Sequence, residues 1–182
     1  MKYLLTREKT ERLEFRLLQA DDFDSWLELF KTANIAKYLD LDPKFSEKEC
    51  CKAWFDKVFH RYENDLGGMN VLIDKETKQL VGQCGLLIQN IEGVERMEVG
   101  YAVLPQFWGQ GFAFEAAVKC KNYAFENNFS PSLISTIHFQ NLNSEKVALK
   151  NGMTFERKLK SFNIFQIGIE FWKVGKFNNS KG

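Results

Sequence analysis

The clearest indication of a binding site lies between Glu98 and Ala117. Here a β-rich run stops at a proline, passes two glycines and continues as an Ala-rich segment. This order predicts a strand, a tight turn and the start of a helix. A turn with the spacing Gln106-x-x-Gly109-x-Gly111 leaves its backbone N–H groups uncovered by side chains, and these groups add to the positive end of the helix dipole. Such a turn can hold an anion, most often a phosphate, or can be a glycine-rich connection without a ligand.

Two common phosphate-binding motifs do not fit this turn. The phosphate loop of nucleotide triphosphatases ends in Gly-Lys-Ser/Thr, whereas this sequence continues Gly111-Phe112-Ala113. The dinucleotide fingerprint needs a small residue where Phe114 stands and an acidic residue about twenty positions further on, closing a βαβ unit. The spacing therefore argues against both of these ligand classes.

The segments before the turn predict antiparallel strands and two amphipathic helices. One helix starts after Asp21 and Asp22, and a longer one opens with the capping box Ser46-x-x-Glu49 and is expected to end near Gly67-Gly68. Strands are expected at residues 10–17, 69–74, 79–89 and 95–104, with a polar hairpin loop at 75–78. Inside the third of these strands, Gly82 and Gly85 indicate a bulge or close packing.

The segments after the turn predict one βαβ unit. A helix from Gly109 to about Asn128 places small residues on one face near its start, so it can lie close to a sheet. The strand at 133–139 should run parallel to the strand before the turn, because a full helix crosses over between them. A short helix follows, with Asn143 or Ser144 as N-cap and Gly152 as its stop. Strands at 153–159 and 164–174 and a frayed polar tail at 176–182 complete the chain.

Two segments in this order resemble one known family. The turn is similar to the acyl-coenzyme A pyrophosphate turn, Gln/Arg-x-x-Gly-x-Gly/Ala, of the GNAT superfamily of N-acyltransferases. The segment from Asn141 to Met153 resembles the Asn-x-x-Ser-x-x-x-x-x-Lys-x-Gly-Phe element of the GNAT enzymes that acetylate ribosomal-protein N-termini (RimJ/RimL-like), with Met153 in place of the Phe. The Thr10-Glu-Arg-Leu, Glu98-Val-Gly-Tyr and Trp108-Gly-Gln-Gly runs fit the same subgroup. The resemblance spans residues 10 to 174.

The resemblance implies an α+β (mixed α/β) fold of the GNAT type. Its largely antiparallel sheet of about seven strands would be splayed at the middle and flanked by helices. It also implies acetyl-CoA as cosubstrate, with the pantetheine arm bonded as a pseudo-strand to the backbone near Val103 and to Asn141. The expected contacts for the pyrophosphate are the backbone amides of the turn: Gln106, Trp108, Gly109, Gln110, Gly111, Phe112 and Ala113. The two N-terminal helices would mostly supply core aromatics, with a minority lining an acceptor pocket.

Acyl transfer from a thioester to an amine needs a neutral amine, a stabilised oxyanion and a protonated leaving thiolate. Glu98 is the candidate base, acting directly or through water. To act as base, Glu98 would need burial to raise its pKa from the value of about 4.3 in water towards the working pH. Otherwise it would only bind and orient the amine, and a solvated strand glutamate would do neither. Many family members use a Tyr as the acid where this chain has Ala148, so the acid is expected to be Ser144 or a water. His138 is expected to be structural, and Tyr101 to be core or pocket wall.

Three functions fit these residues. The first is an acetyl-CoA-dependent N-acetyltransferase whose acceptor is a protein N-terminal amine. The second keeps the chemistry but has a small amine, such as a polyamine or an aminoglycoside, as acceptor. The third is a non-catalytic acyl-CoA binding module. Polycationic acceptors would favour an acidic cleft, and the acidic residues 40, 42, 63 and 65 are too scattered in the sequence to indicate one.

Composition sets the remaining expectations. A chain of 182 residues with 45% hydrophobic and 27% charged residues is typical of a single globular domain, here residues 1–182. The net charge of +1 gives no electrostatic reason to expect nucleic acid or a membrane as partner. Four cysteines and two histidines without metal-ligand spacing predict no metal site. We expect a cytoplasmic monomer or homodimer with free thiols, because the N-terminus lacks a signal peptide pattern.

Overall fold

The computed structural model describes residues 2–179, and the side chains of residues 2–174. Seven strands form one sheet: β1 (Leu13–Arg16), β2 (Gly67–Asp74), β3 (Leu80–Ile91), β4 (Val94–Val103), β5 (Ser132–His138), β6 (Thr154–Leu159) and β7 (Phe162–Gly168). The helices are α1 (Phe23–Phe30), α2 (Ile35–Tyr38), α3 (Glu47–Glu63), α4 (Phe112–Glu126), α5 (Leu142–Lys150) and α6 (Ile169–Asn179). This mixed α/β architecture agrees with the predicted fold class.

The strand order is β1-β2-β3-β4-β5-β7-β6, and every neighbouring pair is antiparallel except β4 and β5. These two strands run parallel, as the crossover through α4 requires. They pair at a single register position, Glu98 with Ile134, although β4 continues to Val103 and β5 to His138. The sheet is therefore splayed at its middle, as predicted.

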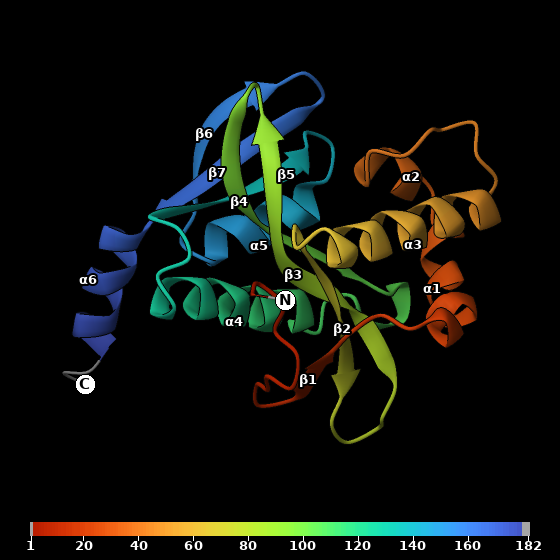
Figure 1. The fold of residues 1–182 in the computed structure, drawn as a ribbon, viewed down its shortest axis with the longest axis horizontal. Helices are drawn as coiled ribbons and strands as arrows, with labels where there is room; N and C mark the ends of the chain where they lie inside the picture. The colour runs from red at the N-terminus through yellow and green to blue at the C-terminus, as the bar shows by residue number, and fades with distance from the viewer. Residues whose placement is uncertain (1, 180–182) are drawn as a thin grey trace.

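Helices cover both faces of the sheet, with α4 on one side and α1 and α3 on the other (Figure 1). The α4 face presents Ala116, Ala117 and Cys120, all fully buried, and such short side chains let the helix axis lie close to the strands. The opposite layer is held by aromatic side chains, among them Trp26 and Trp54. The small-residue face predicted for the helix after the turn is thus the face it packs on the sheet.

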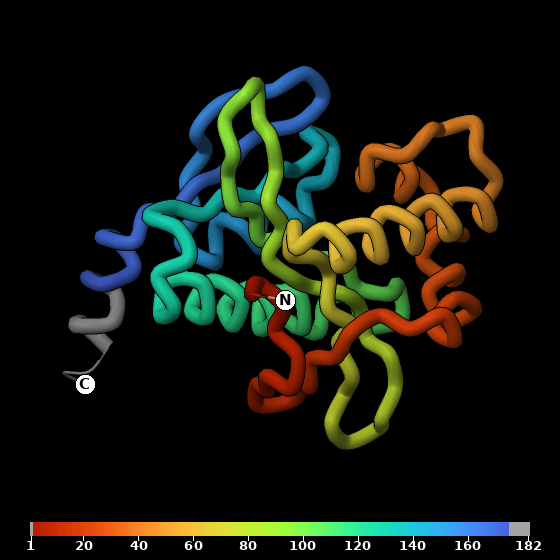
Figure 2. Tube along the Cα trace, viewed as in Figure 1, coloured from red at the N-terminus to blue at the C-terminus, as the bar shows by residue number. Residues whose placement is uncertain are grey.

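The N-terminal segment runs beside α4 before it enters β1 (Figure 2). Glu8 pairs with Lys119 of α4 at 2.6 Å, and Arg12 pairs with Glu115 at 2.6 Å. The Thr10 hydroxyl also donates to Glu115. This segment therefore fixes the N-terminal half of the helix that follows the predicted turn.

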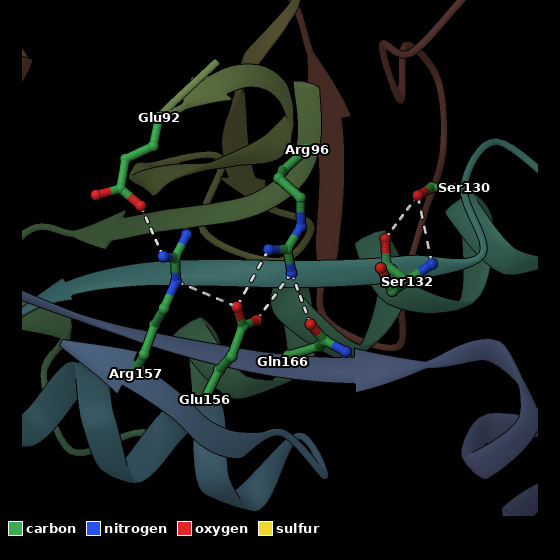
Figure 3. A network of polar contacts seen from close by, with 7 residues as sticks. All are labelled: Glu92, Arg96, Ser130, Ser132, Glu156, Arg157 and Gln166. Atoms are coloured by element: carbon green, nitrogen blue, oxygen red, sulfur yellow. Dashed lines mark hydrogen bonds and ion pairs between the residues drawn. The ribbon is translucent and has the colours of Figure 1, made fainter. Parts of the chain in front are cut away.

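Polar side chains bridge the two halves of the splayed sheet (Figure 3). Arg96 of β4 donates to Glu156 of β6 at 2.9 Å and to Gln166 of β7 at 2.6 Å. Arg157 of β6 pairs at 2.6 Å with Glu92, in the turn between β3 and β4. Because β4 and β5 share one register position, these contacts add a connection between the halves that the backbone ladder does not supply.

Several local predictions are confirmed. The capping box forms, since the Glu49 amide donates to the Ser46 hydroxyl at 3.3 Å and the Glu49 carboxylate accepts from the Ser46 amide at 2.8 Å. Inside β3, a register irregularity of β2 lies opposite Gly82, and a Cβ added to Gly85 would stand 1.9 Å from the carbonyl oxygen of Gly68. The two strand glycines therefore mark a bulge and a close backbone approach.

The larger differences from prediction are one helix end, one helix that was not predicted and one strand end. Helix α3 ends at Glu63, and Gly67 belongs to β2. A Cβ at Gly67 would lie 2.1 Å from the Leu86 carbonyl oxygen. The glycine is therefore required by the close approach of β2 to β3, and it does not end the helix. Helix α2 was not predicted, because it has four residues and no apolar period of its own. The predicted strand at 164–174 ends at Gly168 and gives way to α6.

Helix α6 forms because Trp172 packs on Phe125 of α4, with ring centroids 5.4 Å apart, and donates its indole N–H to Asn122 at 2.8 Å. An alternating apolar pattern cannot reveal such a tertiary contact. The tail at 176–182 was expected to be frayed, but residues 176–179 belong to α6, and residues 180–182 lie outside the described residues.

Candidate active site

A cavity of about 630 Å³ opens where β4 and β5 separate. Its lining comes mainly from α2, α3, β3, β4, β5 and the start of α5, with smaller contributions from β2, β6 and β7, and it includes Glu98, Asn141 and Ser144. Trp54 and Val58 of α3 also line it, so part of the aromatic helix faces the cavity as the family resemblance implied. The structure thus brings the predicted residues Glu98, Asn141 and Ser144 together around one cavity. Val103 and the turn from Gln106 to Ala113 lie at the end of β4, outside the lining of this cavity.

Side chains hold the two strands together at the point of separation. The Ser135 hydroxyl of β5 donates to the Val99 carbonyl of β4 at 2.8 Å, and the Thr136 amide donates to a carboxylate oxygen of Glu98 at 2.9 Å. These backbone groups would otherwise lose their ladder partners, because the strands pair only at Glu98 and Ile134. At the point where the strands separate, the Val99 carbonyl and the Thr136 amide therefore have hydrogen-bond partners.

Glu98 is a buried carboxylate rather than a solvated strand residue, with 7% of its surface exposed. Its second oxygen accepts from the side-chain amide of Gln89 at 2.6 Å. Lys57 and Arg61 of α3 line the same cavity. Burial, then the charge of Arg61, lowers the pKa of Lys57, while Asp40 and Glu98 act in the opposite direction. Glu98 thus lies in a site of mixed charge.

Tyr101 joins β4 to the start of α5, where its hydroxyl donates to the Ser144 carbonyl at 2.7 Å. Burial raises the pKa of this phenol, so it stays protonated near neutral pH. Ala148, at the position where the family pattern has a tyrosine, is fully buried in the core. Tyr101 is therefore a cavity wall that fixes Ser144, in keeping with one of its two predicted roles.

The N-cap of α5 is Asn141, not Asn143 or Ser144 as predicted. Its side-chain oxygen accepts from the Ser144 amide at 3.2 Å. Asn141 takes this role because it is the last residue before the helix and sits in the tight turn after β5, where its own amide donates to the His138 carbonyl at 2.7 Å. The Ser144 hydroxyl is consequently released from capping and remains beside the cavity.

His138 is 2% exposed and packs among aromatic rings, stacking on Phe139 with centroids 4.7 Å apart. Its Nδ1 accepts from the Gln140 amide at 3.2 Å. Burial lowers the pKa of His138, and the nearby charge of Lys37 acts in the same direction. These contacts fit the structural role that the sequence favoured.

The glycine turn has exposed amides at its centre. The Phe107 and Trp108 amides donate to the Leu104 and Pro105 carbonyls, at 2.9 and 3.1 Å. Among the hydrogen bonds of the described residues, the amides of 106 and of 109 to 113 have no acceptor. Gly109 and Gly111 adopt φ values of +74° and +83°, which favour glycine. These free amides, five of them consecutive at the N-terminus of α4, fit a phosphate, whereas the Trp108 amide, which was predicted to join them, is already engaged.

Side chains brace this turn from two directions. The Trp108 indole donates to the Val103 carbonyl at 2.6 Å, and the Gln110 side chain donates to the Gln106 carbonyl at 3.0 Å. The Val103 carbonyl, expected to accept from a pantetheine arm, is therefore occupied. The turn keeps its shape through contacts that leave its central amides exposed.

Arg12 is a component of this turn that sequence reasoning missed. Its guanidinium lies 4.1 Å from the centre of the Phe112 ring and donates to the Gln110 carbonyl at 3.0 Å. The ion pair with Glu115 fixes it there. Arg12 thus adds a cation beside the exposed amides. No local pattern signals this role, because the residue comes from the segment before β1.

Gly111→Ala is expected to weaken binding of acetyl-CoA, the cosubstrate that the family resemblance implies, about tenfold, because a side chain at φ +83° strains the turn by about 1–3 kcal/mol and moves its amides. Isothermal titration calorimetry would measure the change. Gly93→Ala is the matched control: Gly93 has φ +85° with open space around it, in the turn between β3 and β4. Equal affinities for the two variants would show that the Gly111 turn does not bind the cosubstrate.

The described residues contain neither a cluster of metal-ligating side chains nor a membrane-spanning helix. No group of three or more His, Cys, Asp or Glu is placed to hold a metal ion. No helix within residues 2–179 combines the length and apolar character needed to cross a bilayer. Cys50, Cys51, Cys84 and Cys120 are buried free thiols.

The splayed mixed sheet and the glycine turn at the N-terminus of α4 are the arrangement that the resemblance to the GNAT superfamily implied. The family model described as "Acetyltransferase (GNAT) domain" matches residues 12–154, and the chain belongs to the GNAT acetyltransferase family. It is 30% identical over 162 residues to YkkB, an uncharacterized protein of Bacillus subtilis (strain 168), with 87% of this chain and 91% of that protein covered.

Solved structures share the fold. An acetyltransferase from Agrobacterium tumefaciens gives a TM-score of 0.73 at 24% identity, covering 88% of this chain and 92% of that one. RimL, a ribosomal alpha-N-protein acetyltransferase solved in complex with coenzyme A, gives 0.66 at 17% identity, covering 89% and 97%. The predicted family and subgroup likeness are confirmed at the level of fold.

Proposed function

We propose that this chain transfers the acetyl group of acetyl-CoA to the α-amino group of a polypeptide N-terminus. The observation that carries the proposal is the position of Glu98, a buried carboxylate at the fork between β4 and β5 that faces a cavity of about 630 Å³. A carboxylate at this point can bind an ammonium group and accept its proton. The same strand, β4, leads directly to the turn with free amides.

The residues present fit the cosubstrate. The free amides of 109–111 would take its diphosphate, with Arg12 beside them. The Leu104 amide donates to Val81 of β3, so alternation along β4 turns the backbone of Tyr101 and Val103 away from β3, towards the opening. The side-chain nitrogen of Asn141 has no partner among the described hydrogen bonds and would serve the pantetheine arm. When bound, acetyl-CoA supplies a thioester that an amine can attack.

Glu98 is the base in this proposal, and Ser144 or a water is the acid. The Glu98 carboxylate accepts the acceptor proton directly or through a water, which leaves a neutral amine to attack. The Ser144 hydroxyl, which does not cap α5, would give its proton to the leaving sulfur as the carbon–sulfur bond breaks, and would regain one from the nitrogen of the attacking amine. The buried Ala148 contributes no proton.

The charges of the cavity favour an acceptor with one reacting amine over a polycation. Lys57, Arg61 and Lys160 line it together with Asp40, Glu92 and Glu98, and Glu92 is already paired with Arg157. A polyamine or aminoglycoside would meet three cations there against the carboxylates of Asp40 and Glu98, so the cavity offers it no net electrostatic attraction. RimL, with its ribosomal-protein acceptor, shares the fold and supports the same assignment.

The test combines binding and transfer. Wild-type protein is expected to gain several degrees of Tm with millimolar acetyl-CoA and to move labelled acetyl to peptide N-termini in a mass-spectrometric screen of peptides and small amines. Acetylation of small polyamines alone would replace the polypeptide acceptor with a small amine. A shift in Tm without transfer to any amine would identify an acyl-CoA binding module. No shift in Tm would end the proposal.

A further inference from the structure

Arg61 is a buried cation without a counter-ion in contact. It is 8% exposed, and its hydrogen bonds to described residues all go to neutral acceptors. Its guanidinium donates to the backbone carbonyls of Leu66 and Ile88, at 3.3 and 3.0 Å. Burial lowers the pKa of Arg61, and the charge of Glu98 acts in the opposite direction. A charge buried among neutral acceptors is costly, so the nearest carboxylate matters to it.

Gln89 connects Arg61 to that carboxylate. Arg61 donates to the Gln89 side-chain oxygen at 2.8 Å, and the Gln89 side-chain nitrogen donates to Glu98 at 2.6 Å. A guanidinium has only donors, so the amide oxygen must face it. The amide nitrogen then faces Glu98 and needs an acceptor there. The Arg61 charge therefore fixes one orientation of Gln89, and that orientation suits an ionised carboxylate.

The other carboxylate oxygen of Glu98 also accepts a hydrogen bond from a fixed donor. It accepts from the backbone amide of Thr136 at 2.9 Å, and a backbone donor cannot rotate away. With a donor fixed on each oxygen, a proton on either one would displace a hydrogen bond. Each carboxylate oxygen of Glu98 is thus held by its own donor.

Other titratable groups also face the cavity and would act on Glu98 over longer distances. Lys57 comes from α3, His138 from β5, and Asp40, Glu92 and Lys160 from the loops around the rim, with the phenols of Tyr38 and Tyr101 on the walls. They carry both signs and none of them donates a hydrogen bond to Glu98. The Arg61–Gln89 contact is the side-chain contact that selects the ionised form.

We propose that Arg61 and Gln89 are positioning residues that keep Glu98 ionised and hold its carboxylate in place at the fork. This inference rests on the proposed acetyl transfer. In that reaction Glu98 must begin as an anion to receive the proton of the acceptor ammonium. We call the contacts from Arg61 through Gln89 to Glu98 the relay. The relay favours the ionised carboxylate of Glu98 without touching the acceptor or the thioester.

The test is the pH dependence of kcat/KM in Gln89→Leu. Loss of the amide removes a charge-assisted hydrogen bond from the anion, so the acidic limb of the profile is expected to move to higher pH by about one to two units. Gln166→Leu is the matched control, because Gln166 also accepts from an arginine, Arg96, but lies outside the cavity (Figure 3). A profile of Gln89→Leu that coincides with those of wild type and of the control would overturn the proposal.

A second measurement does not depend on activity. In protein carrying ¹³C-labelled glutamate, the Glu98 carboxyl signal is identified by its absence from Glu98→Gln, and its titration midpoint is expected to move upwards in Gln89→Leu and in Arg61→Met. Gln89→Leu is the primary variant, since Arg61 also holds two backbone carbonyls and its loss lowers stability. If the wild type acetylates no amine, the proposed function fails while this titration still tests the relay. An unchanged midpoint in an active enzyme refutes the relay alone.

Discussion

Glu98→Gln is expected to lower kcat for acetyl transfer by about 10²- to 10⁴-fold while leaving the acetyl-CoA-induced rise in Tm unchanged. The amide keeps the size of the side chain and one oxygen that can accept from the Thr136 amide, but it cannot take a proton. The free amides of the turn, which are expected to bind the cosubstrate, lie at the other end of β4. Steady-state transfer of labelled acetyl, with a parallel thermal shift assay, measures both quantities.

Glu156→Gln provides the matched control for this variant. Glu156 is a carboxylate of β6 that pairs with Arg96 at 2.9 Å and does not line the cavity (Figure 3). Its amide variant should transfer acetyl at the wild-type rate. If Glu98→Gln retains most of the wild-type kcat, Glu98 only binds and orients the amine, and the proton leaves by another route.

Gly85→Ala is expected to lower the free energy of unfolding by about 3 kcal/mol, at the upper end of the cost of overpacking. A Cβ at this position would lie 1.9 Å from the Gly68 carbonyl oxygen and 3.0 Å from the Met69 Cα. Both are backbone atoms of β2, so no side chain can rotate to relieve the overlap. The pairing of β2 with β3 would have to shift instead. Urea denaturation at constant pH would measure the change.

Gly168→Ala tests whether this cost comes from the close approach or from replacing any strand glycine. Gly168 ends β7, and its nearest neighbour for a new Cβ is a side-chain carbon of Phe171 at 3.9 Å. A change within 0.5 kcal/mol is expected there. Similar losses in both variants would contradict the steric explanation.

Local chemistry explains which parts of the fold the sequence could predict. A capping box, a polar hairpin loop and two glycines in a strand each act within a few residues, so Ser46 with Glu49 and Gly82 with Gly85 signalled what they do in the fold. The parallel partner of β4 could also be predicted, because a full helix between two strands leaves little choice. The end of β7 could not be predicted, because the helix that follows it, α6, depends on the packing of Trp172 on α4.

The candidate site divides in the same way. The glycine spacing of the turn and the candidate base on the preceding strand could be read directly from the stretch between Glu98 and Gly111. The neighbours that give these residues their properties could not. Gln89 comes from β3, Arg61 from α3 and Thr136 from β5, and Arg12 reaches the turn from the segment before β1.

The sequence by itself determined the order of strand, turn and helix, the conformational freedom of the turn and the presence of a carboxylate on the strand that leads to it. Only the tertiary structure decided that this carboxylate is buried, which donors hold it and which amides of the turn are free. The physical reason is range. Backbone conformation responds to neighbours along the chain, whereas hydrogen bonds and charge interactions at a site depend on side chains that meet only once the sheet has formed.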